Sequence, residues 1–181
     1  ISAADPATID TGALAVLRDL GAHVYTGGDM SDRHLQVLAH QPTLIGDVGF
    51  DLSGTLLDRR PQQADSIEGV VEVSRTGIER LHRREPPPFP VVNIHNGRLR
   101  DAVENRHGVG EGVWRAVGQL TGIHLAGRRL VVIGYGTVGR GLATYARAAN
   151  MSVTVVETDP IRALFAHYDG FPTETLDDAL P

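Results

Sequence analysis

A glycine-rich string lies between an apolar run at residues 130–133 and a stretch with helical periodicity. Gly134, Gly136 and Gly139 form a G-x-G-x-x-G pattern in the context that a dinucleotide-binding loop requires. In such a loop the first glycine permits a tight turn and the second lets the backbone approach a pyrophosphate. The third allows the following helix to pack closely on the strand. The string therefore predicts a site for the pyrophosphate of a dinucleotide.

Three further residues extend this predicted site. Thr137 and Val138 lie between the second and third glycines, just before the predicted helix, whose free backbone N–H groups and partial positive charge favour phosphate. Glu157 follows the next predicted strand and can accept hydrogen bonds from the adenosine ribose, whereas it would repel a 2′-phosphate. NAD is therefore the expected cofactor, rather than NADP. Asp159 is the alternative ribose ligand, although its place before a proline fits a helix N-cap better.

These residues need an α/β framework, and the rest of the chain predicts one. Short apolar runs alternate with helical periodicities, which is typical of parallel sheets covered by helices. Strands are expected over residues 22–26, 43–45, 70–73, 90–94, 130–133 and 152–156. Helices are expected over residues 9–20, 32–40, 77–84 and 141–149, in a long segment from about 108 toward 125, and after 159. We place a domain boundary near residues 106–110, with the long helix as the connector.

The composition excludes several other classes of protein. The 181 residues carry 17 Lys and Arg against 22 Asp and Glu, a net charge of −5, and this acidic balance argues against a nucleic-acid partner. No apolar run approaches the roughly 18 residues of a membrane span, so no membrane partner is expected. The chain has no cysteine, and its 8 histidines lack the spacing of metal ligands, so no metal is expected. A cytoplasmic location fits this composition.

Several segments together resemble the S-adenosylhomocysteine hydrolase family. Residues 134–141 are similar to its glycine loop, including a fourth glycine, and residues 157–164 to its second strand end and following helix. Residues 47–52 resemble the family's acidic loop, and residues 69–77 resemble its Thr-rich segment. Residues 90–96 resemble the strand before its catalytic helix. The resemblance implies Rossmann-like parallel sheets, a tightly held NAD and assembly as a homo-oligomer.

The resemblance also implies a domain organisation. Residues 1–107 correspond to part of a substrate-type α/β domain, and residues 108–181 to a linking helix and the N-terminal half of the NAD-binding Rossmann domain. A complete dinucleotide-binding sheet of about six strands needs two halves. Because only the strands near 130–133 and 152–156 precede Pro181, we expect the chain to be part of a longer protein.

The resemblance assigns further positions to the cofactor, and most of them are kept. Two hydroxyls of the Thr-rich segment are retained as Ser74 and Thr76, while the middle position is Arg75. The asparagine that contacts NAD in the family is retained as Asn105, whereas a cysteine near the nicotinamide falls on Val109. Ser74, Thr76 and Asn105 therefore join the glycine loop and the acidic ribose ligand as predicted cofactor-binding residues.

The positions for the family's chemistry are mostly changed. The catalytic Lys falls on Arg100, which stays protonated and is a poor base, and its partner Asp falls on Glu104 at the same i, i+4 spacing. Two acidic substrate positions fall on Val48 and Val73, which cannot exchange protons. His95 lies just before the family's Asn-Asp pair and is a candidate for a substrate-side role. The candidate catalytic residues are therefore Arg100, Glu104 and His95.

The sequence leaves two functions open. The resemblance implies a hydrolase of one-carbon metabolism that oxidises the 3′-hydroxyl of a nucleoside with NAD, so that homocysteine leaves and water adds. The retained cofactor residues favour an enzyme that oxidises a secondary hydroxyl of a nucleoside-like ligand in an altered substrate site. The changed residues favour an inactive NAD-binding regulatory or scaffold relative that oligomerises. An unrelated 2-hydroxy-acid dehydrogenase would share the glycine loop but would explain residues 93–105 less well.

Overall fold

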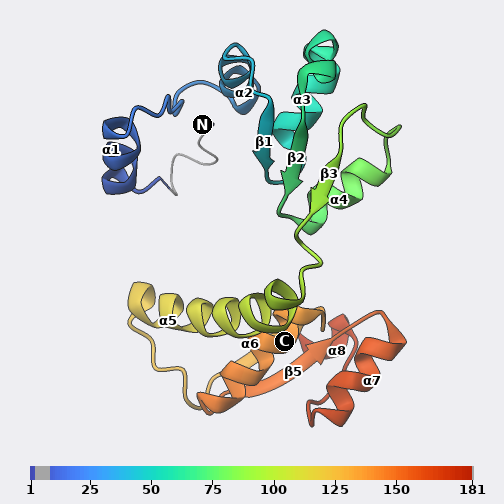
Figure 1. Ribbon diagram of the computed structural model, residues 1–181. Helices are drawn as coiled ribbons and strands as arrows, with labels where there is room; N and C mark the ends of the chain where they lie inside the picture. Colours follow the sequence, from blue (N-terminus) through green and yellow to red (C-terminus); the bar gives the residue numbers. More distant parts are fainter. Residues whose placement is uncertain (3–8, 181) are drawn as a thin grey trace. The chain divides into compact units, whose positions relative to one another are not determined.

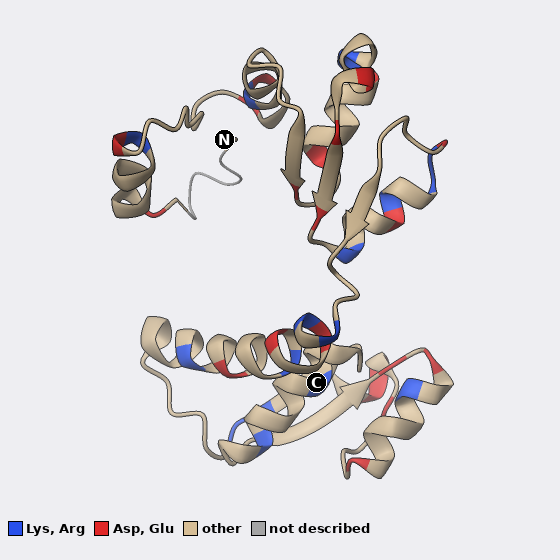
Figure 2. Cartoon of the chain, viewed as in Figure 1, with Lys and Arg blue, Asp and Glu red and all other residues tan. Residues whose placement is uncertain are grey.

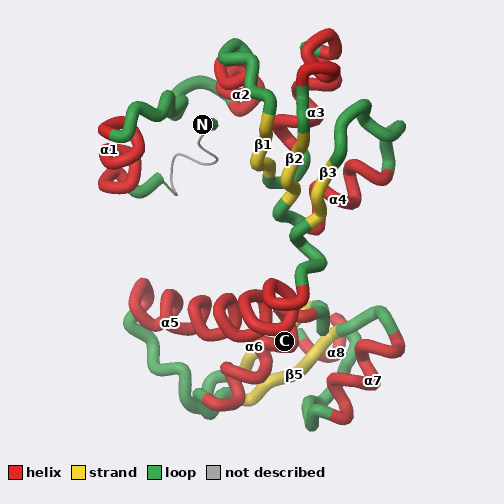
Figure 3. The backbone as a smooth tube through the Cα atoms, in the orientation of Figure 1, coloured by secondary structure: helices red, strands yellow, loops and turns green. Residues whose placement is uncertain are grey.

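The computed structural model describes residues 1–2 and 9–180, and the chain folds as two units, Ile1–His95 and Asn96–Pro181 (Figure 1). Each unit combines parallel strands with helices, drawn in yellow and red in Figure 3. The α/β class predicted from the sequence is therefore confirmed. Positively and negatively charged residues are interspersed along the helices of both units (Figure 2). No helix in the described part of the chain is long and apolar enough to cross a bilayer.

The first unit is built on a three-stranded parallel sheet in the order β1-β2-β3. Its strands are β1 (Leu44–Asp47), β2 (Gly69–Glu72) and β3 (Val91–Asn93). Its helices are α1 (Thr11–Asp19), α2 (Met30–Leu38), α3 (Asp51–Arg59) and α4 (Arg75–His82), together with the 3₁₀ helix η2 (Pro61–Ser66). Apolar side chains from the sheet and its covering helices form one core, which includes Leu38, Ile45, Leu56, Val70 and Phe89.

Two parts of this unit differ from the sequence-based prediction. The strand predicted over residues 22–26 does not form: among the described residues only Tyr25 makes a β-bridge, and its partner is Ser2. Apolar alternation is not enough for a strand, which also needs a continuous hydrogen-bonding neighbour. Helix α3 was not predicted because its N-cap residue, Phe50, has a left-handed backbone (φ 57°) and offers no side-chain cap. The groups that stabilise its start lie elsewhere in the chain.

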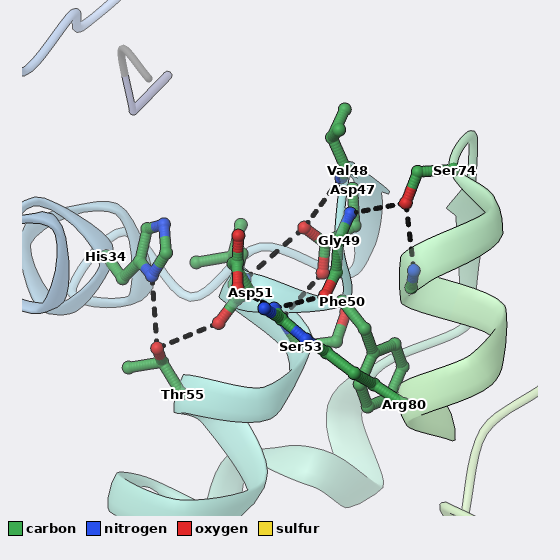
Figure 4. A network of polar contacts seen from close by, with 12 residues as sticks. His34, Asp47, Val48, Gly49, Phe50, Asp51, Ser53, Thr55, Ser74 and Arg80 are labelled. Atoms are coloured by element: carbon green, nitrogen blue, oxygen red, sulfur yellow. Dashed lines mark hydrogen bonds and ion pairs between the residues drawn. The ribbon is translucent and has the colours of Figure 1, made fainter. Parts of the chain in front are cut away.

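Two buried carboxylates, Asp47 at the end of β1 and Glu72 at the end of β2, organise the loop between β1 and α3. Figure 4 shows Asp47 and the loop residues around it. Asp47 accepts a hydrogen bond from the backbone N–H of Ser53 at 2.8 Å and so caps α3 from the preceding strand. Glu72, which is 0 % exposed, accepts from the backbone N–H groups of Gly49 at 3.1 Å and Phe50 at 2.8 Å. Both carboxylates are thus hydrogen-bonded to backbone, which compensates their burial.

The start of α4 completes the hydrogen bonding of Glu72. Ser74 donates to this carboxylate from its backbone N–H and from its hydroxyl, each at 2.7 Å. The Ser74 hydroxyl also accepts from the backbone N–H groups of Gly49 at 2.8 Å and Gly77 at 2.9 Å, the second of which makes Ser74 the N-cap of α4. A Cβ at Gly77 would overlap the Glu72 carboxylate, so this position requires glycine. One carboxylate therefore joins the ends of two strands to the helix that follows.

The second unit contains the two-stranded parallel sheet of β4 (Arg129–Ile133) and β5 (Ser152–Val156). Its helices are the π-helical segment η3 (Arg100–Val109), α5 (Gly110–Thr121), α6 (Thr137–Ala148), α7 (Pro160–Tyr168) and α8 (Leu176–Ala179). The core of this unit includes Val132, Tyr135, Ala143, Val155 and Phe171. The two predicted strands and the helix between them are therefore observed where the glycine string requires them.

The long helix begins earlier than predicted. Helical backbone continues from Arg100 through Val109 with π geometry and on to Thr121, so Gly108 lies inside the helix rather than at its start. Packing of η3 against α6 stabilises the helix through this glycine, which sequence rules place at a terminus. The domain boundary expected between residues 107 and 108 lies within this helix, and residues 96–107 belong with the second unit.

Two glycines set the distance between this helix and α6. A Cβ at Gly141 would overlap the carbonyl oxygen of Arg106, and a Cβ at Gly110 would lie 2.9 Å from the carbonyl carbon of Gly141. Gly141 is the fourth glycine of the loop string, and its role in this structure is helix packing. The close approach places η3 directly against the N-terminal half of α6.

Glu72→Gln is expected to lower the free energy of unfolding by about 2–3 kcal/mol. The amide has nearly the same shape, but its nitrogen cannot accept the backbone hydrogen bonds that the carboxylate receives. Urea unfolding followed by circular dichroism measures the change. Glu79→Gln is the matched control, because Glu79 pairs with Arg75 (2.8 Å) on an exposed helix face, where an ion pair contributes little. Equally small effects of both substitutions would contradict the structural role of Glu72.

Candidate functional site

The glycine loop between β4 and α6 has an open backbone face. Gly134 has a φ of +94°, which favours glycine, and its N–H donates to the Val156 carbonyl at 2.7 Å, so the loop begins in register with β5. A Cβ at Gly139 would overlap the carbonyl oxygen of Gly134, so the first turn of α6 packs directly on the loop. At Gly136, in contrast, the nearest atom to a Cβ would be a guanidinium nitrogen of Arg162 at 3.9 Å.

The start of α6 leaves its backbone N–H groups available. Gly136 is the N-cap and provides no side-chain cap for the first turn, which begins with Thr137 and Val138. Uncapped N–H groups beside an open glycine backbone form a cradle that fits a phosphate or pyrophosphate. The Thr137 hydroxyl donates to the Asp101 carboxylate of η3 at 2.6 Å, so this side chain contacts protein rather than the open face.

Glu157, at the end of β5, lies beside this cradle. One carboxylate oxygen accepts from the backbone N–H of Tyr135 at 2.6 Å, and the other from those of Thr158 at 2.8 Å and Asp159 at 2.9 Å. Hydrogen bonds from the N–H groups of Asp159 and Tyr135 hold the pKa of the Glu157 carboxyl below its usual value. Glu157 is therefore a fixed, ionised acceptor next to the glycine loop, which is the chemistry that recognition of ribose hydroxyls requires.

Asp159 has a different role in the structure. Its carboxylate accepts from the backbone N–H groups of Ile161 at 2.8 Å and Arg162 at 3.2 Å, so it is the N-cap of α7, with Pro160 at the first helical position. The same carboxylate lies 3.7 Å from the Arg162 guanidinium. This geometry agrees with the sequence argument for Asp159 as a cap and leaves Glu157 as the better placed acid.

Asn105 lies on η3 and is 7 % exposed. Within the described residues, its side-chain amide makes no hydrogen bond to protein, and neither amide atom is fully enclosed. An amide that still reaches solvent can pair with a polar ligand. The placement of Asn105 on the segment that packs against α6 puts it in the same unit as the glycine loop.

The candidate catalytic residues divide between the two units. Arg100 and Glu104 lie on η3, where an Arg100 guanidinium nitrogen donates to the Glu104 carboxylate at 2.9 Å. The predicted i, i+4 pairing is therefore present as a partly exposed ion pair. His95 is partly buried at the end of the first unit. Among residues 1–2 and 9–180, no group of three or more His, Asp and Glu side chains is arranged to hold a metal ion.

Ser74 and Thr76 lie in the first unit, at the start of α4. The Ser74 hydroxyl already makes three hydrogen bonds, with the Glu72 carboxylate and the N–H groups of Gly49 and Gly77. Its geometry is that of a structural N-cap, whereas Thr76 is exposed in the first turn. Their contact with a cofactor stays a prediction.

Sequence reasoning missed the connection that Tyr135 makes behind the loop. Tyr135 is the residue between the first two glycines, and its side chain is buried, with its hydroxyl donating to Asp169 at 2.8 Å. The glycine pattern does not specify this position, and Asp169 lies 34 residues away at the end of α7, so no local signal links them. The only hint in the sequence is an aromatic residue inside a glycine turn.

Comparisons with known proteins identify this arrangement. Residues 105–181 match the family model described as the S-adenosyl-L-homocysteine hydrolase, NAD binding domain. The chain is 35% identical to the S-inosyl-L-homocysteine hydrolase of Methanopyrus kandleri, over 99% of this chain and 44% of that protein. It is 34% identical to the adenosylhomocysteinase of Thermococcus kodakarensis, over 94% of this chain and 42% of that protein. Among solved structures, the phosphoglycerate oxidoreductase of Vibrio cholerae aligns with a TM-score of 0.49 at 14% identity, covering 87% of this chain and 54% of that one.

The chain thus spans less than half the length of the curated relatives that it matches. The match to the NAD-binding domain begins at Asn105 and includes the whole glycine loop and Glu157. NAD is accordingly the cofactor of this domain, as the acidic residue after β5 predicts. Residues 105–181 therefore belong with the NAD-binding domain of the S-adenosyl-L-homocysteine hydrolase family, and similarity to proteins of this family extends over nearly the whole chain.

Proposed function

We propose that the chain binds NAD in the second unit through the glycine loop, with Glu157 as the ribose ligand. The observation that carries this proposal is the position of the Glu157 carboxylate, which is hydrogen-bonded to the backbone N–H of Tyr135 inside the loop. The pyrophosphate would lie on the open face at Gly136, against the uncapped N–H groups of Thr137 and Val138. Asn105 would contribute its side-chain amide from η3.

We further propose that the substrate side differs from that of the family's hydrolases. In the first unit, Val48 is 64 % exposed where the resemblance places an acidic residue, and Val73 replaces a second one. Neighbouring Glu72 cannot substitute for them, because its carboxylate is buried and accepts hydrogen bonds from backbone and Ser74. The first unit therefore lacks the proton-exchanging groups that the resemblance implies at these positions.

At the position in the second unit where the resemblance places a catalytic lysine, Arg100 keeps the positive charge but cannot act as a base. Arg100 stays protonated throughout the working pH range, so it can bind an anionic group but cannot take a proton from a substrate. No lysine side chain among these 181 residues can take the place of a catalytic Lys, since they contain none. Of the Arg100–Glu104 pair, Glu104 is the member that can accept a proton.

The reaction that this arrangement supports best is oxidation of a secondary hydroxyl on a nucleoside-like ligand. Bound NAD supplies the hydride acceptor. Glu104 would receive the hydroxyl proton, while Arg100 would orient a carboxylate or phosphate of the ligand through its planar fork. Homo-oligomeric assembly and a cytoplasmic location belong to the same proposal. The alternative, favoured by Val48 and Val73, is an NAD-holding regulatory or scaffold protein without catalysis.

Gly136→Val is expected to abolish NAD binding while leaving the melting temperature nearly unchanged. The valine side chain would extend into open space and occupy the face that the pyrophosphate must approach. Isothermal titration with NAD and thermal unfolding measure the two properties separately. Gly139→Ala is the contrasting variant, because its Cβ would overlap the loop carbonyl and it should lower the melting temperature as well. Unchanged NAD affinity in Gly136→Val would refute the proposed pyrophosphate site.

Glu157→Gln is expected to weaken NAD binding by about 10- to 100-fold, since hydrogen bonds to a charged acceptor contribute about 1.5–3 kcal/mol. The affinity for NADP should fall much less, because the repulsion between the carboxylate and a 2′-phosphate is removed at the same time. Titration with both nucleotides measures the ratio. Asp159→Asn is the matched control and should leave the ratio unchanged. If Asp159→Asn changes the ratio and Glu157→Gln does not, Asp159 is the ribose ligand.

Catalysis is tested by mixing the protein with NAD and, in turn, S-adenosylhomocysteine, S-inosylhomocysteine and the free nucleosides. Appearance of the absorbance of reduced cofactor with any of them supports the proposed oxidation. Glu104→Gln should then bind NAD normally but reduce it at least about tenfold more slowly, because it cannot accept the proton. Tight NAD binding without reduction by any of these ligands would instead favour the scaffold alternative.

A further inference from the structure

Tyr135 connects the glycine loop to the interior of the second unit. Its backbone N–H donates to Glu157 at 2.6 Å, while its side chain is 3 % exposed and extends away from the open face into the core. The ring packs against Phe171, with ring centroids 5.9 Å apart. A single residue thus has its main chain at the proposed ribose ligand and its side chain in the hydrophobic core.

The Tyr135 hydroxyl contacts a charged group rather than an apolar surface. It donates to one oxygen of Asp169 at 2.8 Å, and Asp169 is the C-cap residue of α7. The other oxygen accepts from a guanidinium nitrogen of Arg140 on α6 at 2.9 Å, and a second Arg140 nitrogen lies 2.7 Å from the carboxylate. Asp169 therefore links the loop, the helix that follows it, and α7.

The shifts in pKa favour the protonated Tyr135 phenol and the ionised Asp169 carboxylate, which are the forms that this hydrogen bond requires. Burial and the hydrogen bond to Asp169 raise the pKa of the Tyr135 phenol above its ordinary value, so it remains a donor. Burial raises the pKa of the Asp169 carboxyl, but the hydrogen bonds from Tyr135 and Arg140 more than offset it, and the pKa is lowered overall. The carboxylate thus stays charged and the hydrogen bond charge-assisted, which makes it stronger than a neutral one.

We propose that Asp169 is a positioning residue for NAD, acting through Tyr135. By holding the phenol, Asp169 fixes the peptide between Gly134 and Gly136, which directs the Tyr135 N–H to Glu157 and keeps the cradle open. Neither Asp169 nor the phenol contacts the cofactor, so their effect on affinity is indirect. The inference rests on the proposed NAD site and adds to it a group that determines the loop's geometry. It also gives a physical reason for a tyrosine inside a glycine turn.

The experiment compares Tyr135→Phe and Asp169→Asn with the double variant. Each single substitution should weaken NAD binding by about tenfold, because each removes the same charge-assisted hydrogen bond. The double variant should bind NAD as tightly as the single variant with the lower affinity, since the two residues act through one interaction. The preference for NAD over NADP should also narrow in all three, because Glu157 loses the fixed N–H that orients it. A purely structural defect would lower the melting temperature without changing this preference.

Arg147→Gln is the matched control. Arg147 donates to the main-chain oxygen of Asp169 at 2.7 Å and lies over the Phe171 ring at 4.2 Å, so it contacts the same region without touching the carboxylate. This variant should be less stable but bind NAD with wild-type affinity at a temperature well below unfolding. Asp169→Glu, which keeps the charge, should recover part of the affinity that Asp169→Asn loses.

The outcomes separate this inference from the proposed function. If the unsubstituted chain binds NAD and Gly136→Val does not, the site stands. Wild-type affinity and nucleotide preference in Asp169→Asn and Tyr135→Phe would then overturn the positioning role alone. Additive losses in the double variant would also overturn it, because they would mean that the two side chains act independently. If Gly136→Val binds NAD normally, the proposed site itself fails.

Discussion

The close approach of α6 to its neighbours is the constraint on which the second unit depends. At Gly139 any side chain would overlap the carbonyl oxygen of Gly134, and at Gly141 it would overlap that of Arg106. Two glycines on one helix thus allow α6 to pack against the loop on one side and against η3 on the other. The packing of η3 on α6 also places Asn105 in the same unit as the loop, while the helix start is uncapped because Gly136 has no side chain. Larger residues at either position would separate elements that must act together.

The two units use glycine and carboxylates in related ways but with different results. In the first unit, Gly77 leaves room for the Glu72 carboxylate, which is buried and accepts its hydrogen bonds from the protein itself. In the second unit, Glu157 likewise accepts backbone hydrogen bonds at the end of a parallel strand, but it remains partly exposed beside an open loop. A carboxylate at a strand end is therefore a candidate ligand only where the surrounding backbone leaves it accessible. By this criterion Glu157 qualifies and Glu72 does not.

What the sequence predicted was local, and what it missed depends on distant partners. The glycine string, the strands on either side of it and the Asp159 cap are each determined within a few residues, and each is present. Helix α3 begins where the Asp47 and Glu72 carboxylates accept its N-terminal N–H groups, and the Tyr135–Asp169 hydrogen bond joins residues 34 apart. The strand expected over residues 22–26 has β-forming residues, but among the described residues only Tyr25 pairs, with Ser2. Periodicity reports burial along one segment and contains no information on which other segment lies opposite.

The proposed function depends on the chemistry of Arg100, which lies where the resemblance implies a catalytic lysine. A lysine beside a carboxylate can lose its proton when its surroundings favour the neutral amine, whereas arginine keeps its charge in every protein environment. In this structure the Arg100 guanidinium is paired with the Glu104 carboxylate on the same helix. Under the proposed function, proton exchange would fall to this carboxylate, and the guanidinium would bind an anionic group of the ligand. A cofactor loop that resembles the family's, together with an arginine at position 100, is therefore the pattern expected if NAD binding is retained and the substrate has changed.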